Sequence, residues 1–420
     1  MSIQDNTLQD NIVNEFKKTN LHQRHRLGKV WYSIFLFSTL IGIIALSALL
    51  LNITNDSFGL IAFKYKIQPG TLFNGRALES LTKEELNTIL ENNTSANRYR
   101  TIFKEKSLED TTQQEMVDLV IDEVAKPQVI KTWSYFESIT NKDEIRQEIL
   151  EKYPDAELKF RSWITPRFIQ SAQNSNPLWA GIKTAILGSL WIIFVTMVIA
   201  VPIGVGAAIY LEEYANHKLW INQAIQTNIN NLAAVPSIIY GILGLTIFVR
   251  AMAPITSGSV FGFGDSSALN GRTILSGAFT LAILVLPLII LNTQEALRSV
   301  PSSLREASYG LGATKWQTVR SHVIPNSISG ILTGTILAIS RAFGETAPLI
   351  VVGVSTYMTV NPANIFSQFT TLPAQIYQWT ARPQDIWRNL SAAAIIVLMV
   401  VLLALNATAI LLRNKYSRKY

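Results

Sequence analysis

The hydrophobic positions of this chain fall into long apolar runs that are separated by polar segments. The first run, 31–51, contains no charged residue and is long enough to cross a hydrocarbon core of about 30 Å as a helix. Five more apolar runs follow in the second half of the chain, and they cover 182–211, 225–249, 273–291, 328–352 and 390–412. The pattern predicts an all-α polytopic membrane protein with about six transmembrane helices.

The first apolar run is either part of a cleaved signal peptide or a membrane anchor that is retained. A signal peptide has an apolar region of about 7–15 residues, which ends at a cleavage site of small residues. This run is longer and continues into Asn-Ile-Thr-Asn at 52–55. We therefore expect 1–30 to be an N-terminal tail and 31–52 to be an uncleaved signal anchor.

A long polar segment, 53–180, follows the first run. It contains 16 Lys and Arg residues and 19 Asp and Glu residues, whereas 181–420 contains only 15 and 7. This contrast predicts that 53–180 is a soluble domain inserted after the first helix. Residues 181–420 are then expected to form a membrane-embedded core with five transmembrane helices.

Within the polar segment, several patterns predict secondary structure. Two Thr-x-x-Glu sequences, at 82–85 and 112–115, have the spacing of a helix capping box. Apolar residues within 116–124 recur at helical spacing and stop before a proline, and the isoleucines at 145 and 149 indicate another helix. Leu158 and Phe160 favour a short strand. We expect a small α or α+β domain.

Basic residues flank the predicted spans unequally and predict the orientation of the chain. Most of them lie in the tail 1–30, in the segment 292–327 and in the C-terminal tail 413–420. A six-helix arrangement places these three segments on one side of the membrane. Because short cytoplasmic segments are enriched in Lys and Arg, we expect both termini in the cytoplasm and 53–180 outside the cell (inner or plasma) membrane.

Composition removes several classes of function. The chain has no cysteine, which excludes disulfides, thiolate metal sites and cysteine nucleophiles. Its net charge of +7 does not indicate nucleic-acid binding, because the basic residues lie mainly beside apolar runs. The chain also lacks a His-Glu-x-x-His motif and a Gly-x-x-x-x-Gly-Lys-Ser/Thr phosphate loop. We expect no catalysis and no ATP hydrolysis by this chain.

The segment 295–325, between the fourth and fifth predicted helices, carries the most specific motif. Pro301 is suited to the start of a short helix, and Gly312 can adopt the left-handed conformation that ends one. A second short helix from about Lys315 then leads to Pro325. These features predict a helix–turn–helix at the membrane surface. By themselves they also fit an amphipathic loop that only rests on lipid headgroups.

The spacing within this loop resembles the EAA loop of type I ABC importer permeases. The sequence Glu306-Ala307-Ser308 is followed after three residues by Gly312, and after nine more by a tetrapeptide that ends in Pro325. It departs from the family pattern at three positions, Ser308, His322 and Ile324. The resemblance implies that the loop docks in a groove of a separate ATP-binding subunit. It also implies that Gly312 bends the loop and that Glu306 pairs with a basic residue of that subunit, which would use ATP and Mg while this chain binds no cofactor.

Two charges, Arg341 and Glu345, interrupt the apolar run 328–352. They are four residues apart and therefore share one helical face, where an unpaired charge within the membrane would be costly. Pro348 cannot donate a backbone hydrogen bond, so we expect a kink that leaves the carbonyl of Gly344 without its helical partner.

This charged pair has two interpretations. It could be a buried ion pair that only maintains helix packing, as the nearby Gly330-x-x-x-Gly334 motif would favour. Alternatively, the guanidinium of Arg341 could line an anion path, because it can hold an oxyanion with two hydrogen bonds.

The segment Arg341-Ala-Phe-Gly-Glu-Thr-Ala-Pro348 resembles the signature of PstA-type permeases of phosphate ABC importers. Further matches lie at 235–244, 372–377 and 405–410, so that the resemblance covers about 181–420. It implies a type I ABC importer permease fold and a translocation path that includes four residues, Arg341, Glu345, Thr346 and Pro348. It also implies four kinds of partner: a PstC-like permease, two copies of an ATPase, an extracytoplasmic phosphate-binding protein and inorganic phosphate.

Other functions remain open at this point. An ABC permease for molybdate, tungstate or sulfate would share most of these features, although the segment 341–348 argues against it. A secondary transporter driven by an ion gradient could use Glu345 as a proton site, but it would not need an ATPase-docking loop.

Overall fold

The computed structural model describes residues 4–68, 76, 78–103, 108, 111–216, 218–263, 270–355 and 357–416. The chain forms two compact units, Met1–Asn55 and Asp56–Tyr420. In the second unit, we call residues 57–180 the inserted domain and residues 181–416 the core.

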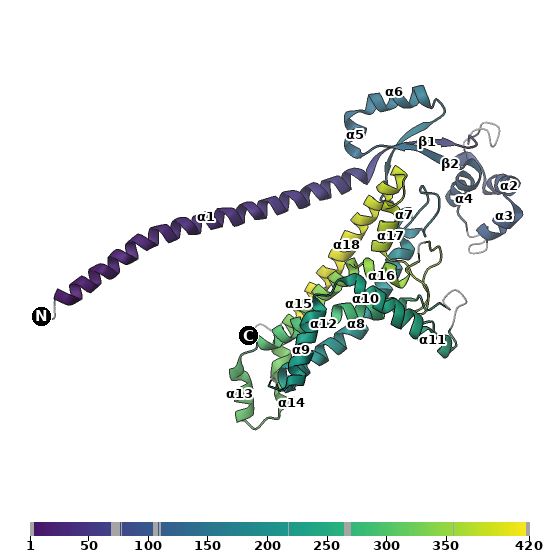
Figure 1. Cartoon of the computed structure of the whole chain (residues 1–420). Coiled ribbons are helices and arrows are strands. Elements are labelled where there is room, and N and C mark those ends of the chain that lie inside the picture. The colour runs from purple at the N-terminus through teal and green to yellow at the C-terminus, as the bar shows by residue number, and fades with distance from the viewer. Residues whose placement is uncertain are drawn as a thin grey trace. The chain divides into compact units, whose positions relative to one another are not determined.

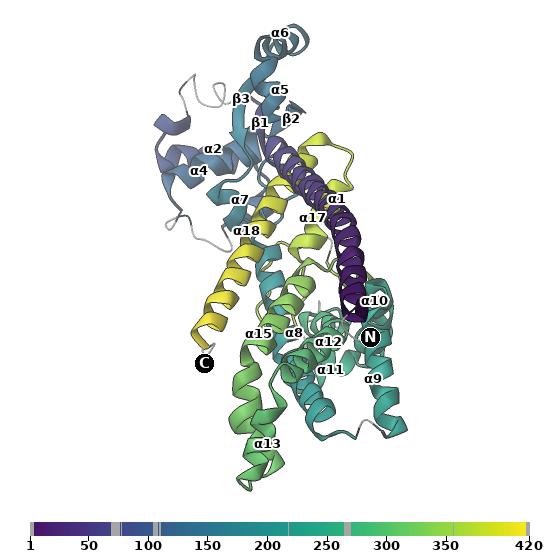
Figure 2. The same ribbon diagram turned by 90° about the vertical axis from the view of Figure 1, so that its left-hand side faces the viewer.

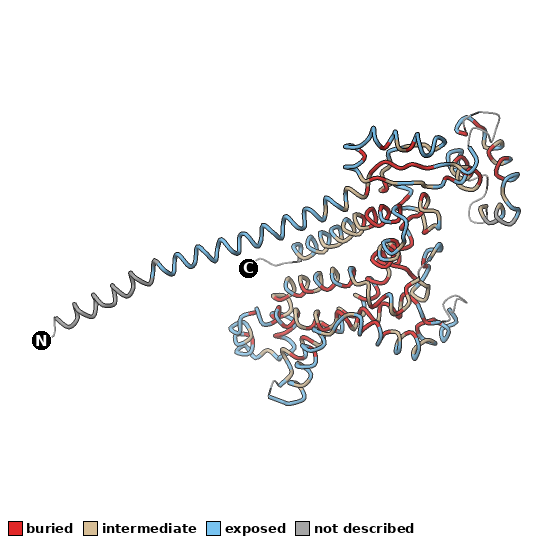
Figure 3. The backbone as a smooth tube through the Cα atoms, turned by 45° about the horizontal axis from the view of Figure 1, so that its top comes forward, coloured by how far each residue is buried: buried red, intermediate tan, exposed pale blue. Residues whose placement is uncertain are grey.

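The first unit consists of helix α1, Gln4–Asp56, which continues into the first residue of the second unit. It includes the predicted first span, and residues 23–49 of this helix are exposed (Figure 3). Hydroxyl groups in this part, such as those of Ser38 and Thr39, donate to backbone carbonyls four residues earlier. The polar groups of these side chains are thus satisfied within the helix, as a lipid environment requires.

A three-stranded antiparallel sheet organises the inserted domain, with the strand order β2-β1-β3 (Figure 2). Its strands are β1 (Phe58–Tyr65), β2 (Pro127–Thr132) and β3 (Glu157–Ser162). The sequence patterns predicted only β3. Strand β1 was not predicted because it is the buried central strand, so that its sequence shows a continuous apolar run instead of an alternation. Strand β2 forms by pairing with β1.

Six α-helices are described in the inserted domain: α2 (Lys83–Asn93), α3 (Ala96–Ile102), α4 (Gln113–Val120), α5 (Tyr135–Thr140), α6 (Lys142–Lys152) and α7 (Pro166–Gln170). Both predicted capping boxes are present at the starts of α2 and α4. Apolar residues of these two helices share one small core, and Ile145 and Ile149 of α6 pack with Leu60 of β1 in another. The domain is therefore α+β.

Eleven helices are described in the core: α8 (Lys183–Ile209), α9 (Trp220–Ala233), α10 (Ser237–Gly244), α11 (Ala253–Thr256), α12 (Ile274–Arg298), α13 (Ser302–Gly310), α14 (Lys315–Thr318), α15 (Ile324–Gly344), α16 (Ala347–Val352), α17 (Leu372–Thr380) and α18 (Asp385–Tyr416). Within this unit, α13 and α14 lie at the end opposite to the sheet (Figures 1 and 2).

Helix α12 lies at the centre of the core, between α8 and α15. Small residues allow the close approach on both sides. A Cβ atom placed on Gly330 or Gly334 of α15 would lie 2.6 Å from the Cβ of Ala296 or 2.5 Å from that of Asn292. The predicted role of the Gly330-x-x-x-Gly334 motif in close packing is thereby confirmed.

Among the described residues, five helices are long and apolar enough to cross a membrane, or six if a bent pair counts as one span. The third predicted span, 225–249, is not one straight helix. Here α9 and the helix that starts with α10 meet at a bend of 104°. Pro236 causes the break, because it lacks a backbone N–H and disfavours helical geometry in the preceding residue.

The fifth predicted span, 328–352, also differs from the expectation of a kinked but continuous helix. Helix α15 ends at Gly344, and Glu345 has extended backbone angles, with φ −73° and ψ 119°. Helix α16 then starts at Ala347 with Pro348 in its first turn, where no backbone donor is required. The run is therefore two helices with a break, which contains Glu345 and Thr346, while Arg341 lies in the last turn of α15 and Pro348 in the first turn of α16.

Candidate functional site

Arg341 and Glu345 face each other at the end of α15. The Nε atom of Arg341 lies 3.4 Å from a carboxylate oxygen of Glu345. The Arg341 side chain is 40% exposed and that of Glu345 17%. Among the described residues, no further hydrogen-bond partner of the Arg341 guanidinium is found. Most of its donors are therefore available to a ligand.

The break after Gly344 determines the local geometry of this pair. Thr346 lies in the break, and its hydroxyl donates a 3.4 Å hydrogen bond to the Gly344 carbonyl. Pro348 is buried against α10, where a Cβ atom on Gly241 would lie 2.7 Å from the Pro348 Cα. The four predicted pathway residues thus lie together, but Pro348 packs against another helix, whereas Arg341 and Glu345 are accessible.

Two hydrogen-bonded pairs of uncharged side chains in the core were not predicted from the sequence. Ser340, next to Arg341, donates a 2.7 Å hydrogen bond to Asn406 of α18. Farther along the core, Gln226 of α9 and Gln294 of α12 exchange two hydrogen bonds, at 3.1 and 2.8 Å. Isolated polar residues inside apolar helices were a possible signal, but their partners come from distant parts of the chain.

The loop between α12 and α15 forms the predicted helix–turn–helix. Helix α13 is preceded by Pro301 in place of a serine cap, and Gly312 has a φ of +81°. Its backbone N–H donates to the carbonyl of Tyr309 at 2.9 Å. Thr314 and Gln317 form a capping box that starts α14, a feature that the sequence analysis did not note. A π-helical turn, Val319–Val323, then leads into α15, where Pro325 occupies the first turn.

Much of the surface of this loop is exposed. Leu311 is 90% exposed and Trp316 55%, and Glu306 and Ala307 are also exposed. Ser308 and Thr318 are buried, and their hydroxyl groups lie 2.9 Å apart, which joins α13 to α14. A rigid turn that displays large apolar side chains and a carboxylate has the properties of a docking surface.

Two acidic residues at the end of the first core span hold this loop. Glu213 pairs with Arg305 of α13 at 2.7 Å, and Arg305 also donates to the carbonyls of Val300 and Leu297. Glu212 forms a more exposed pair with Arg298 at 2.9 Å. These pairs were not predicted from the sequence, although two adjacent glutamates directly after an apolar run were a visible signal.

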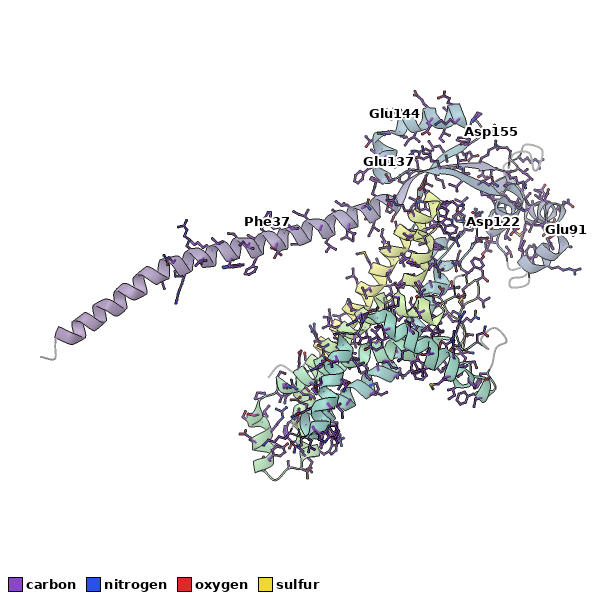
Figure 4. The ribbon with its side chains drawn as sticks, viewed as in Figure 1. Phe37, Glu91, Asp122, Glu137, Glu144 and Asp155 are labelled. Atoms are coloured by element: carbon purple, nitrogen blue, oxygen red, sulfur yellow. The ribbon has the colours of Figure 1, made fainter. Side chains whose placement is uncertain are left out.

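The sequence-predicted site residues therefore form two groups. Arg341 lies sixteen positions after Pro325 in α15, so that the helix separates the groups by about 24 Å at its usual rise of about 1.5 Å per residue. Among the described residues, no cluster of three or more His, Asp or Glu side chains could hold a metal ion. Five acidic residues labelled in Figure 4 illustrate this dispersion, since each comes from a different element or turn of the inserted domain.

Comparison with known proteins gives this geometry its context. Residues 200–418 match the family described as binding-protein-dependent transport system inner membrane component. The chain belongs to this family. The inserted domain lies outside the matched residues.

Three relatives illustrate the similarity. The chain is 34% identical over 263 residues to the probable ABC transporter permease protein YqgI of Bacillus subtilis, which covers 59% of this chain and 83% of the relative. It is 33% identical over 242 residues to the phosphate transport system permease protein PstA of Yersinia pestis, with 58% and 75% covered. It is 36% identical over 201 residues to the PstC protein of Pasteurella multocida, with 46% and 61% covered. The resemblance to PstA-type permeases is confirmed, and the chain is a multi-pass membrane protein of the ABC permease class.

Proposed function

We propose that this chain is the transmembrane permease subunit of an ATP-driven importer of inorganic phosphate. One observation carries the proposal: an accessible arginine, paired with a single glutamate, lies at a helix break within a core related to phosphate permeases. Phosphate carries one or two negative charges near neutral pH, and an apolar path would exclude it because of its desolvation. A guanidinium compensates this penalty without needing to bind a proton.

In this proposal, Arg341 binds phosphate transiently and Glu345 competes for the same guanidinium. The competition keeps binding weak enough for release, which transport requires. Thr346 contributes a hydroxyl beside the pair, and Pro348 positions the break against α10. The path is completed by a homologous PstC-like permease.

The loop α13–α14 is proposed to dock on the ATP-binding subunit. The exposed side chains around Glu306, Ala307 and Leu311, with the turn at Gly312 and the helix start at Pro325, support this role. Two copies of the ATPase would use ATP and Mg. In this arrangement both termini face the cytoplasm, and the inserted domain lies on the side where a phosphate-binding protein delivers the ligand.

The test is uptake of radioactive phosphate by vesicles that contain the complete reconstituted transporter. We expect uptake that requires ATP and the binding protein and that persists in an excess of molybdate, tungstate or sulfate. If one of these ions is transported instead, the chain is a permease for that oxyanion. Uptake that needs no ATPase but follows an ion gradient would establish a secondary transporter.

A further inference from the structure

A polar cavity of about 260 Å³ lies beside the start of α12, apart from the Arg341–Glu345 pair. It is lined by Asn270, Arg272, Gly353, Val354, Ser355 and Gln368. These residues come from two segments, one that precedes α12 and another that connects α16 to α17. Two distant parts of the chain thus line one cavity, which we call the cup.

Arg272 is the charged residue of this cup. It is exposed, and no carboxylate of the described residues lies within ion-pair distance of it. None of the described residues that line the cup is acidic, and the carboxamide of Asn270 supplies further N–H groups. An arginine with no counter-charge among the described residues, next to an amide, suits an anion and disfavours a cation.

The backbone holds the arginine in this place. Gly353 has a φ of +102°, and a Cβ atom there would lie 2.6 Å from the Cδ of Arg272 and 2.7 Å from its Nε. The Arg272 side chain therefore packs directly on the backbone of Gly353, in space that the side chain of any other residue at position 353 would occupy. The Ser355 N–H donates to the Phe369 carbonyl at 2.9 Å, which joins the two ends of the second segment.

We propose that this cup is a second oxyanion site, which binds inorganic phosphate before the ion reaches Arg341. Helix α16 connects the two places: it starts two residues after Glu345 and ends next to Gly353. Its six residues span about 9 Å at the usual helical rise. The role in transport rests on the proposed function, whereas phosphate binding by the cup does not. With one arginine and an open surface, binding is weak and reversible, as a site along a path requires.

Chemical modification tests the binding directly. The complete transporter in phosphatidylcholine nanodiscs is treated with phenylglyoxal, which reacts with guanidinium groups, and modified arginines are identified by mass spectrometry. We expect inorganic phosphate, compared with chloride at equal ionic strength, to slow the modification of Arg272. Arg250, which is exposed but does not line the cup, is the matched control and should react at an unchanged rate.

A phospholipid headgroup offers the same phosphate chemistry, so a second arm adds phosphatidylglycerol to the nanodiscs. Protection by free phosphate in both arms supports the proposal. Protection by phosphatidylglycerol alone assigns the cup to lipid, and equal rates of modification with and without phosphate overturn the site.

Transport supplies an independent measurement. We expect Arg272→Gln to raise the phosphate concentration for half-maximal uptake by roughly tenfold, the effect of losing one charge-assisted hydrogen bond. Arg272→Lys should restore part of it, and Arg250→Gln should resemble the wild type. If the wild type imports no phosphate but phosphate still protects Arg272, the transport proposal fails and the site stands. Normal uptake by Arg272→Gln, together with unprotected Arg272, refutes the site alone.

Discussion

Two arginine–glutamate pairs of the core, Arg305–Glu213 and Arg341–Glu345, differ in how completely their charges are satisfied. Arg305 contacts Glu213 at 2.7 Å and donates to two backbone carbonyls, and the two side chains are 19% and 6% exposed. Arg341 makes one contact of 3.4 Å with Glu345, and the side chains are 40% and 17% exposed. The first pair joins two distant segments, whereas the second joins successive turns of one helix.

This difference separates a structural ion pair from one that can bind a ligand. A buried pair in which all three guanidinium nitrogens are hydrogen-bonded contributes to a unique arrangement, and removal of one partner leaves an uncompensated charge. A long, partly exposed contact between residues four positions apart adds little stability. The N–H groups of Arg341 can therefore exchange Glu345 for an anion with a small loss of stability. The comparison predicts that changes at Arg341 affect transport, and that changes at Glu213 affect the loop.

The largest effect is expected at Arg341. Arg341→Gln should reduce phosphate uptake by about 100-fold, which corresponds to the loss of about 2–3 kcal/mol from charged hydrogen bonds. Arg341→Lys keeps the charge but not the forked geometry and should retain part of the uptake. Glu345→Gln should lower the maximal rate more than the apparent affinity. Uptake, co-purification of the partner permease and basal ATP hydrolysis are measured together.

Assembly is the control that separates the two interpretations of Arg341. Intact assembly with lost uptake supports a pathway role. If Arg341→Gln instead prevents assembly with the companion permease, the pair is structural, and normal uptake would contradict both roles.

The next effect concerns the turn of the docking loop. Gly312→Pro should abolish transport, because proline cannot adopt a φ of +81° and loses the N–H bond to Tyr309. Gly312→Ala should have a smaller effect, since no atom lies within 4 Å of its added Cβ and only the backbone conformation is unfavourable. Glu306→Lys should weaken docking without changing the fold. Co-purified ATPase and transport are the measurements, and undiminished transport in Gly312→Pro and Glu306→Lys would refute docking.

A smaller effect is expected for Glu213→Gln, which leaves Arg305 without its counter-charge. We expect a loss of about 2–4 kcal/mol in local stability, as for other buried pairs that lose one partner. The readout is faster proteolysis of the loop and a lower temperature of unfolding in detergent. The matched control is Glu212→Gln, whose partner Arg298 is 56% exposed, and it should cost at most about 1 kcal/mol. Equal effects of the two variants would contradict the comparison.

The smallest effect concerns an exposed cluster in the inserted domain. Hydrogen bonds from Lys131 and then Lys152 lower the pKa of Glu148 below its ordinary value. Because the pKa of Glu148 is lower in the folded state, its ionised carboxylate stabilises the folded domain at pH values above the unfolded-state pKa. This contribution disappears as the pH falls through the folded-state pKa. The difference in unfolding temperature between wild type and Glu148→Gln should therefore be small at neutral pH and vanish in acid. If the difference in unfolding temperature instead grows toward low pH, the pairing of Glu148 with the lysines has the opposite effect on stability.

Local signals in the sequence determined much of this protein. The capping boxes at Thr82 and Thr112, the left-handed Gly312 and the close packing at Gly330 and Gly334 appear as predicted. Each depends on interactions within a few residues or on the size of one side chain. The apolar runs likewise identified the membrane helices, because their length alone meets the thickness of a bilayer.

Tertiary structure decided what depends on distant partners. Strand β1 forms because β2 and β3 pair with it, although almost seventy positions separate its start from β2. Pro348 was expected to kink one helix, yet packing of α16 against α10 through Gly241 accompanies a complete break. The pairing of Glu213 with Arg305 spans ninety-two positions. No local pattern specifies such contacts, because closing these loops is favourable only when the whole core is assembled.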